Sequence, residues 1–392
     1  IKVKLSAEKK LILGSVKIQP TRQELDMLDA LLTQVTDWEY VGKHIVDRGI
    51  GPLLFKKLAL LNNKDLIPEQ LVVRLQQSYY LTMSRNILMY NVFSQVVDAF
   101  TQHEIQIIAL KGIYLSESMY KDIALRQFSD IDLLVKEEDG EKCISLLYQM
   151  GYTAYDSQER DIVVKTKAEA IHYTPMVKDG VSIELHTRLN RKKESYNLDI
   201  TSLWQNARPV TINKSELYSL DSYDLLIHLC THADKHFVEG KIQFTCFNDI
   251  TNCIESYKRA SDWKELTDRC LQYRCEEIVF KYIMLVYKYM HANVPDEISE
   301  QHTSLLTEKD EQLFINYLSG EFEEFTAVPF HFKNISELDS LSDKAKYILA
   351  VLFPDKSFMI KSYHIKIPSL YLLYYPYRWF VGLKGLIGKI NK

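Results

Sequence analysis

The segment that most restricts the fold is Ser129–Val135, in which Asp130 and Asp132 enclose one isoleucine and are followed by a short apolar run. Side chains alternate along an extended chain, so both acids lie on one face of a predicted strand. Carboxylates this close repel each other unless a cation lies between them. Mg²⁺ is the usual cation and commonly binds substrate phosphates as well. The alternative is a strand-end turn capped by Asp130, with Asp132 solvated.

A strand–turn–helix pattern precedes the two aspartates. Residues 105–110 form a short β-prone run, and Gly112 opens a predicted helix that continues to about residue 120. The unpaired N–H groups and positive potential of a helix N-terminus suit a triphosphate. Lys111 lies at the same turn, where it is either a phosphate ligand or an exposed lysine at a strand end.

A third acid is expected on a neighbouring strand. The turn sequence Asp179-Gly180 separates residues 168–177 from residues 181–186 and is a strong hairpin signal. Alternation in the second run places Glu184 and His186 on one face. A carboxylate there can complete a two-metal site and help to deprotonate an attacking hydroxyl. His186 either supports Glu184 or is an internally satisfied strand histidine, and we favour the second interpretation.

A helix predicted over residues 223–236 carries His228, His232 and His236, with Lys235 beside the last. Three side chains stacked along one helix cannot all reach a single zinc ion, so a packed stripe is the favoured interpretation. Contact of Lys235 and His236 with a nucleotide or acceptor is the alternative. Asp249 is expected to pair with one of these two residues.

These motifs together resemble a family of uncharacterised bacterial nucleotidyltransferases within the polymerase-β-like superfamily. The resemblance covers roughly residues 35–355, and its motifs specify the family more sharply than any substrate. It rests on Leu110-Lys111-Gly112, on Arg126 with Ser129-Asp130 and Asp132-Leu-Leu-Val135, on Glu184-Leu185-His186, on Asp37-Trp38-Glu39 with Gly51-Pro52-Leu53-Leu54, and on residues 224–236 followed by Asp249.

The resemblance implies a role for each matching residue. Lys111, Gly112 and Lys235 would contact the nucleotide, and Arg126 would steady either phosphate or the loop before Asp130. The metal ligands and catalytic residues would be Asp130, Asp132 and Glu184, binding Mg²⁺ or Mn²⁺. The wider superfamily usually has Ser or Gly after the glycine and a shorter gap to the two aspartates, whereas this chain has Ile113 and a longer gap. Ser129 is the residue that could replace the missing hydroxyl.

The predicted fold is of the α+β class, with a small mixed sheet between helical regions. The expected parts are an N-terminal helical region (residues 1–100), a nucleotidyltransferase core (101–215), a C-terminal helical domain (216–355) and a basic, aromatic tail (356–392). Within the core, a helix is predicted over residues 138–150. The tail carries lysines and no acid after Asp355, so it packs on the protein, holds an anionic acceptor or contacts an anionic membrane surface, and packing is the favoured interpretation.

The predicted activity is Mg²⁺-dependent transfer of a nucleoside monophosphate from an NTP to a hydroxyl or phosphate, with release of pyrophosphate. The alternatives are a non-catalytic nucleotide sensor or scaffold, and transfer of a sugar from a nucleotide sugar. The formal net charge of −4 argues against long nucleic acid as a partner and favours a small-molecule, sugar, peptide or protein acceptor. Six cysteines without a Cys-x-x-Cys pair, and no secretory signal, favour free thiols and a cytoplasmic location. The chain begins at Ile1, so its first residues are expected to be trimmed or foreign.

Overall fold

The computed structural model describes residues 5–155, 171–190, 194–238 and 243–319, together with most of residues 341–380. The chain divides into two compact units. The larger unit comprises residues 1–154 and 171–322, and the smaller comprises residues 155–170 and 323–392. The expected tail, residues 356–392, lies in the smaller unit, and its residues 381–392 lie outside the described part of the chain.

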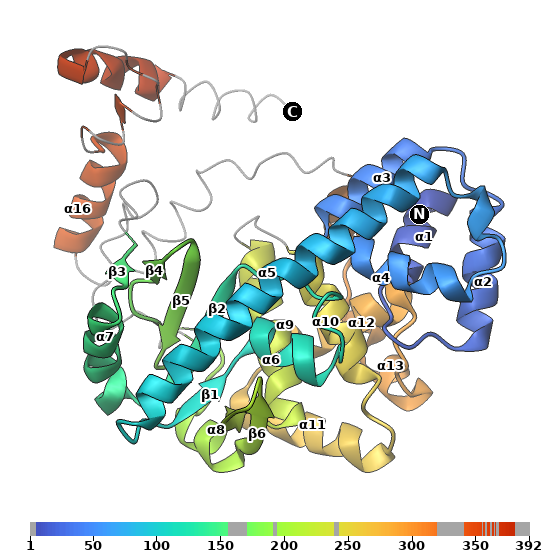
Figure 1. The fold of residues 1–392 in the computed structure, drawn as a ribbon, viewed down its shortest axis with the longest axis horizontal. Coiled ribbons are helices and arrows are strands. Elements are labelled where there is room, and N and C mark those ends of the chain that lie inside the picture. Colours follow the sequence, from blue (N-terminus) through green and yellow to red (C-terminus); the bar gives the residue numbers. More distant parts are fainter. Residues whose placement is uncertain are drawn as a thin grey trace. The chain divides into compact units, whose positions relative to one another are not determined.

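The larger unit begins with a group of helices whose ends follow local sequence signals. Thr21 caps α2 by accepting a hydrogen bond from the Glu24 N–H, and the Glu24 carboxylate accepts one from the Thr21 N–H. Pro68 precedes the long helix α5, which packs on α4 at one end and contacts the sheet and α7 further along (Figure 1). The helices are α1 (Ala7–Gly14), α2 (Arg22–Leu32), α3 (Trp38–Asp47), α4 (Gly51–Lys57) and α5 (Glu69–Thr101), with 3-10 turns at Leu58–Leu60 and Lys64–Leu66.

One mixed sheet follows, with the strand order β3-β4-β5-β2-β1-β7-β6 among the described residues. The central strand β2 is parallel to β5 and antiparallel to β1, and β1 is parallel to β7. The remaining neighbours are antiparallel. The strands are β1 (Ile107–Ala109), β2 (Asp130–Val135), β3 (Thr153–Ala154), β4 (Met176–Lys178), β5 (Val181–His186), β6 (Arg208–Ile212) and β7 (Ser215–Ser219).

Alternation along β2 and β5 divides the apolar residues between two cores. Ile131, Leu133 and Ile183 belong to the core that also contains residues of α5 and α7, whereas Leu134 belongs to the core formed with α9, α10 and α12. Even-numbered side chains of β2 therefore point towards the side of the sheet that α9 covers, and Asp132 shares that face with Leu134. Helices α6 (Lys111–Ser118), α7 (Gly140–Gln149) and α8 (Ile200–Asn206) connect the strands, with a 3-10 turn at Glu137–Asp139.

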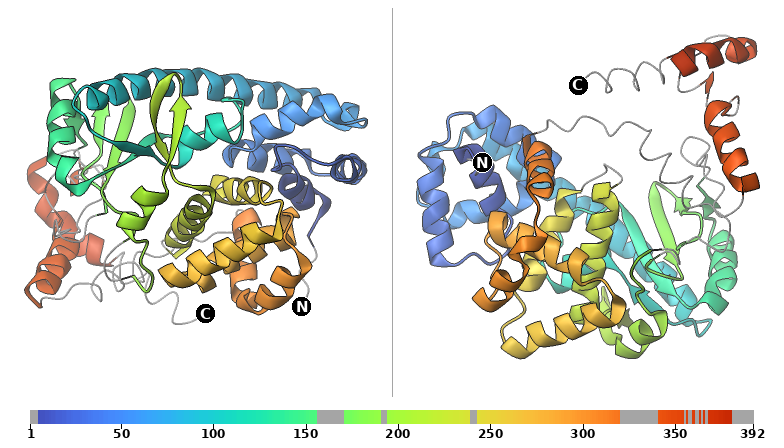
Figure 2. Two further views of the ribbon diagram at one scale, coloured as in Figure 1. Left: turned by 90° about the horizontal axis from the view of Figure 1, so that it is seen from below. Right: turned by 180° about the vertical axis from the view of Figure 1, so that it is seen from behind.

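The second helical group packs on this face of the sheet (Figure 2). Its central helix α9 contacts α10, α11 and α12, and large buried aromatic residues such as Phe247 and Phe280 fill the space between them. The helices are α9 (Ser222–Val238), α10 (Phe244–Ile254), α11 (Ala260–Tyr273), α12 (Glu276–Met290), α13 (Asp296–His302) and α14 (Glu308–Ser319), with a 3-10 turn at Thr303–Leu305.

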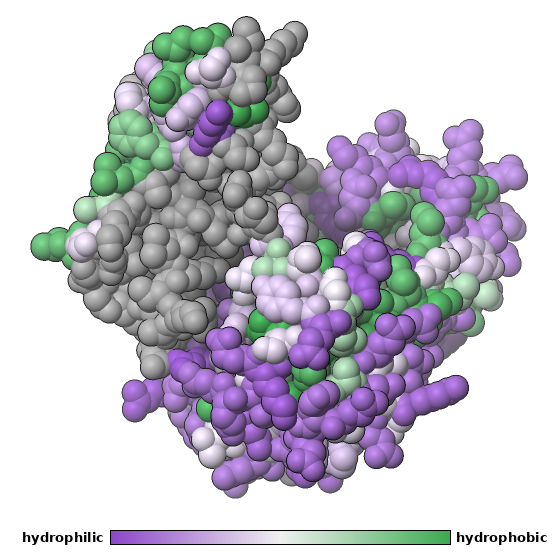
Figure 3. Space-filling view, turned by 60° about the vertical axis from the view of Figure 1, so that its left-hand side comes forward, coloured by the Kyte–Doolittle hydropathy of each residue, from purple (hydrophilic) through white to green (hydrophobic). Residues whose placement is uncertain are grey.

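The described part of the smaller unit contains α16 (Leu341–Leu352), a 3-10 segment (Pro368–Leu373) and a helical segment over residues 374–380. Many of its apolar side chains are exposed, including Leu349, Leu373 and Phe380. They form much of the coloured surface at the upper left of Figure 3. None of the helices in the described residues is both long and apolar enough to cross a membrane.

The observed mixed sheet with abundant helix is consistent with the expected α+β class, and the strand predicted at residues 130–135 is confirmed. Two details differ. The helix predicted over residues 138–150 begins only at Gly140, after a 3-10 turn. The first hairpin arm, predicted over residues 168–177, is a strand only at Met176–Lys178, and residues 168–170 lie outside the described part. The hairpin of β6 and β7 was not anticipated.

Candidate functional site

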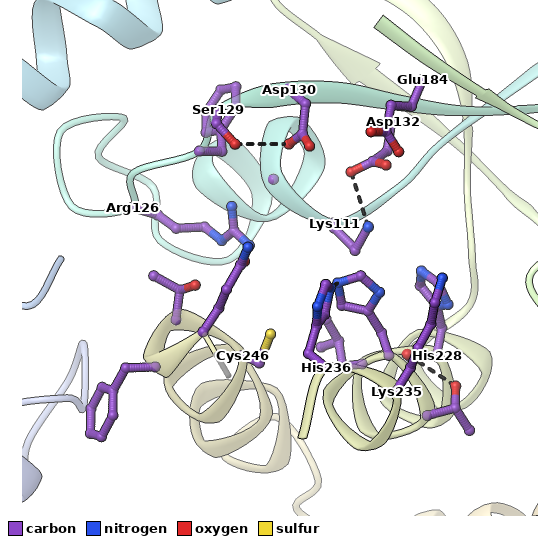
Figure 4. A pocket seen from close by; sticks show the side chains of 18 of the residues that line it. Lys111, Arg126, Ser129, Asp130, Asp132, Glu184, His228, Lys235, His236 and Cys246 are labelled. Carbon is purple, nitrogen blue, oxygen red and sulfur yellow. Dashed lines mark hydrogen bonds and ion pairs between the residues drawn. The ribbon is translucent and has the colours of Figure 1, made fainter. Parts of the chain in front are cut away.

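The three acids expected to bind metal lie on the face of the sheet turned towards α9. In the parallel pairing of β2 and β5, Asp132 is the register partner of Glu184, and Asp130 is the partner of Ser182. Figure 4 shows the Asp132 and Glu184 side chains next to each other, with Asp130 nearer to Ser129. The fold therefore brings two of the carboxylates side by side and places the third two residues away on the same face.

The electrostatic properties of these acids differ because their neighbours differ. Burial disfavours ionisation of Asp132, but Lys111 and His186 outweigh this effect and hold its pKa well below the usual range. Burial and the charge of Asp132 raise the pKa of Asp130. Burial, followed by Asp132 and Asp130, raises the pKa of Glu184 to about 7. The raised pKa values of Asp130 and Glu184 indicate that full ionisation of all three acids would exceed the positive charge around them.

Lys111 provides the positive charge closest to Asp132. The backbone of Lys111 has a φ of 37°, in the left-handed region, at the start of α6. The preceding N–H, of Leu110, donates a hydrogen bond to the Asp132 carbonyl. The Lys111 Nζ atom lies 3.2 Å from Asp132 Oδ2, and this contact is almost fully buried. Burial opposes the charged form, but Asp132, Asp130 and Glu184 together raise the pKa of Lys111.

His186 contacts the same carboxylate from the other side. Its Nε2 atom lies 2.8 Å from Asp132 Oδ1 and 3.7 Å from Glu184 Oε2. Its Nδ1 atom is buried and has no hydrogen-bond partner among the described residues. The favoured interpretation of an internally satisfied histidine is therefore wrong, and His186 instead contacts both acids of the register pair.

Asp130 lies at the opposite edge of the site. The Ser129 hydroxyl donates a hydrogen bond of 3.4 Å to Asp130 Oδ1. From α5, Arg85 directs its guanidinium to the carbonyl oxygens of Phe128 and Ser129, each at 3.4 Å. This arginine holds the residues immediately before β2, and no sequence motif had indicated it.

Arg126 forms a buried ion pair with Asp249 of α10, and this arrangement corrects the expectation that Asp249 pairs with Lys235 or His236. The Arg126 guanidinium donates to both carboxylate oxygens at distances of 2.6–3.1 Å. The Tyr120 hydroxyl also donates to Asp249, at 2.9 Å. Burial opposes ionisation of Arg126, but Asp249 outweighs it and raises the pKa of the guanidinium. The pair therefore ties the loop before β2 to the second helical group.

Gly112 allows α6 to begin directly against this loop. A Cβ atom at this position would lie 2.7 Å from the Phe128 Cβ and 2.9 Å from the Arg126 Nη1. Contacts that short do not occur in folded proteins, so a side chain at Gly112 would displace the loop or the helix. The glycine is thus required by packing at the point where a nucleotide phosphate is expected.

Helix α9 forms the wall opposite the acids (Figure 4). The Nε2 atoms of His232 and His236 lie 3.0 Å apart, so one donates a hydrogen bond to the other. Burial and the nearby Lys111 lower the pKa of His228 to about 3 and hold the pKa of His232 well below its usual range. These two imidazoles are therefore neutral at pH 7. The predicted stripe exists, but it lines a pocket.

All eight predicted site residues line one pocket of about 650 Å³. Within it, ligand atoms of Asp132, Glu184 and His186 lie within 4.8 Å of one another. Two carboxylates that repel each other at this distance fit a divalent cation with oxygen ligands, such as Mg²⁺ or Mn²⁺. The residues brought together in the pocket are Lys111, Gly112, Arg126, Ser129, Asp130, Asp132, Glu184 and Lys235.

Comparison with known proteins gives one family. A family model described as an uncharacterised nucleotidyltransferase matches residues 34–291, which is more than half of the chain. The matched range includes the whole sheet and every residue of the candidate site named above. No curated protein matches the chain.

Proposed function

The chain belongs to this family of nucleotidyltransferases and is therefore an enzyme of that class, and from this premise we propose that it moves a nucleoside monophosphate from an NTP to a hydroxyl or phosphate acceptor and releases pyrophosphate. The observation that carries the proposal is the register pairing of Asp132 with Glu184 beside the buried Lys111. A sheet face that holds two repelling carboxylates and a lysine suits a metal-bound triphosphate.

In this proposal Asp130, Asp132 and Glu184 hold Mg²⁺ or Mn²⁺. When bound, the ion would neutralise triphosphate charge and polarise the α-phosphate. His186 and Lys111 fix the Asp132 carboxylate, each through one of its two oxygens. The raised pKa of Glu184, about 7, suits this carboxylate to accept the proton of an acceptor hydroxyl near neutral pH.

Five further residues would bind or position the nucleotide. Lys111 and Lys235 approach the pocket from opposite walls, and their charges would balance phosphate oxygens. Gly112 allows the phosphates close to the N-terminus of α6. The Ser129 hydroxyl lies at the same edge as Asp130. Because the Arg126 guanidinium is bound to Asp249, we assign it the role of holding the loop rather than of binding phosphate directly.

The acceptor proposed here is a small molecule, a sugar, or a residue of a peptide or protein. The pocket has acidic and basic residues in similar numbers, and the formal net charge of −4 does not suit long nucleic acid. A cytoplasmic location is proposed from the six free, buried thiols. For the smaller unit we propose contact with an anionic membrane surface, supported by its exposed aromatic residues and by the lack of acids after Asp355.

The test is a pyrophosphate-release assay with each NTP, Mg²⁺ or Mn²⁺, and panels of hydroxyl, sugar and peptide acceptors. Glu184→Gln should lower turnover by about 10²–10⁴-fold, the range for loss of a general base. Asp130→Asn should weaken metal binding measured by calorimetry. Asp179→Asn is the matched control, because Asp179 is an exposed acid in the turn before β5.

The two other functions are distinguished in the same experiments. NTP binding without pyrophosphate release across all acceptors would identify a sensor and overturn the proposal. A product that carries an added hexose mass, rather than a nucleoside monophosphate, would identify sugar transfer. Full turnover in Glu184→Gln would show that Glu184 is not the base of the reaction.

A further inference from the structure

His186 lies on β5 within reach of both acids of the register pair. Its Nε2 atom is 2.8 Å from Asp132 Oδ1 and 3.7 Å from Glu184 Oε2. All three ligand atoms lie within 4.8 Å of one another. A hydrogen bond between nitrogen and oxygen requires a distance of about 3.2 Å or less, so the contact with Glu184 is not one. A hydrogen bond from His186 therefore explains its contact with Asp132 but not its approach to Glu184.

The three atoms are spaced as ligands of one metal ion are. Bonds from a divalent ion such as Zn²⁺ or Mg²⁺ to imidazole nitrogen or carboxylate oxygen are about 2.1 Å long. Two ligands of the same ion are therefore about 3.0 Å apart when adjacent at a right angle and about 4.2 Å apart when opposite. The distance from His186 to Asp132 is close to the first value, and the distance to Glu184 lies between the two. This geometry suits a single ion with all three side chains as ligands.

The fold holds these atoms in place from two strands. Asp132 and Glu184 are register partners in β2 and β5, and His186 follows two residues later on the same face. His186 is 5% exposed, and the ring of His172 packs against it with 5.3 Å between the centroids. Lys111 contacts the second oxygen of Asp132, Oδ2, which leaves Oδ1 for the ion. Side chains on paired strands are positioned more precisely than those on loops, so the imidazole stays beside the carboxylates.

We propose that His186 binds the ion directly through Nε2, and that the site therefore prefers a first-row transition-metal ion such as Mn²⁺ to Mg²⁺. Mg²⁺ is a hard cation that takes oxygen ligands, whereas imidazole suits transition-metal ions. Two carboxylates and one imidazole form a mixed set of oxygen and nitrogen ligands, which a first-row ion accepts more readily than Mg²⁺ does. The inference rests on the metal site of the proposed function and narrows the choice of ion there.

The first test detects the nitrogen ligand itself. Mn²⁺ bound to an imidazole shows a hyperfine coupling to nitrogen in pulsed electron paramagnetic resonance, and Mn²⁺ bound by oxygen alone does not. The full chain loaded with Mn²⁺ alone should show this coupling. Growth with histidine that carries the heavy nitrogen isotope should change the coupling as the different nuclear spin requires. This measurement needs no variant, so it does not depend on the folding of one.

A second measurement tests the preference between ions. Displacement of bound Mn²⁺ by Mg²⁺, followed by the resonance signal of free Mn²⁺, gives the ratio of the two affinities. Loss of a group that only orients a ligand already lowers metal affinity about 10–100-fold. His186→Gln should therefore weaken Mn²⁺ binding at least about tenfold, weaken Mg²⁺ binding less, and abolish the nitrogen coupling.

The matched control is His228→Gln. His228 is as well buried as His186, at 4% exposure, and lines the opposite wall of the same pocket. It does not belong to the group of ligand atoms found among the described residues. The control should keep both the nitrogen coupling and the preference for Mn²⁺.

Three results would overturn the proposal. The first is Mn²⁺ bound to the wild type without nitrogen coupling, the second is a coupling that survives in His186→Gln, and the third is a ratio of affinities that this variant leaves unchanged. Nitrogen-bound Mn²⁺ without pyrophosphate release from any NTP would support the ligand assignment and overturn only the proposed activity. Turnover with an ion held by oxygen alone would overturn only the ligand assignment.

Discussion

The buried pair of Arg126 and Asp249 gives the sharpest prediction for stability. Replacing Asp249 with Asn removes the negative charge but keeps the side-chain shape. Arg126 is 8% exposed and Asp249 is 1% exposed, so water cannot replace the lost charge. Removing one partner of such a buried pair costs about 3–5 kcal/mol, because the other charge stays buried without compensation. Urea unfolding followed by tryptophan fluorescence should show a loss of this size in the free energy of unfolding.

An exposed pair supplies the control for this prediction. Arg22 and Asp26 form an ion pair on α2, with side chains 66% and 57% exposed. Asp26→Asn removes the same charge, but the expected loss is only about 0.3–0.5 kcal/mol, because water screens this pair. Both variants change Asp to Asn, so the difference between them isolates the effect of burial.

A double-mutant cycle tests the cause of the loss. Arg126→Met removes the charge that Asp249→Asn would leave uncompensated, so the double variant should be destabilised by clearly less than the sum of the two single variants. Two results would refute the reasoning. One is additivity of the single effects, and the other is a loss in Asp249→Asn no larger than that in Asp26→Asn.

Three more predictions follow from other parts of the chain. Without added metal ion, the wild type should lose stability relative to Glu184→Gln as the pH rises from 4.5 to about 7. The reason is that the Glu184 carboxyl releases its proton in the unfolded chain but retains it in the folded protein over this range. Urea titrations of both proteins measure this, and equal changes of stability with pH would contradict the prediction. Gly112→Ala should lower the free energy of unfolding by about 1–3 kcal/mol through overpacking against Phe128, and it should also abolish NTP binding. Thermal melting measures the first effect and calorimetry the second. An unchanged melting curve would contradict the packing argument. Replacing the exposed Trp379 and Phe380 with Ala should reduce co-sedimentation with vesicles that contain anionic lipid, and equal binding of the variant would remove the proposed membrane contact.

Local patterns predicted the strands of the site because their causes are local. The alternation at residues 130–135 and 181–186 identified both strands and the faces of their acids, and the Asp179-Gly180 turn identified the hairpin. The β6–β7 hairpin was missed because its turn is Asn213-Lys214, in which a lysine adopts a positive φ that side chains rarely favour.

Contacts between distant segments could not be predicted in the same way. Arg126 and Asp249 are separated by 123 residues, and the choice of Asp249's partner depends on how α10 packs against the loop before β2. The histidine stripe of α9 was visible as a periodicity, but only the fold decides that it faces the sheet. Nothing in the sequence around Arg85 indicates that it reaches the carbonyl of Ser129.

The side chains of β2 are buried on both faces of the sheet, and this burial holds the pocket wall that carries the acids in place. Leu133 and Leu134 are fully buried in two different cores, so the strand cannot leave the sheet without opening both. Backbone amides in such positions exchange with solvent deuterium only through global unfolding, so the amide of Asp132 should be among the slowest in the protein. The facing wall is formed by α9 together with residues of α10 such as Cys246, and it contains no strand of the sheet among the described residues. Any adjustment of the pocket to acceptors of different size is therefore expected in this helical wall, while the spacing of the acids stays constant.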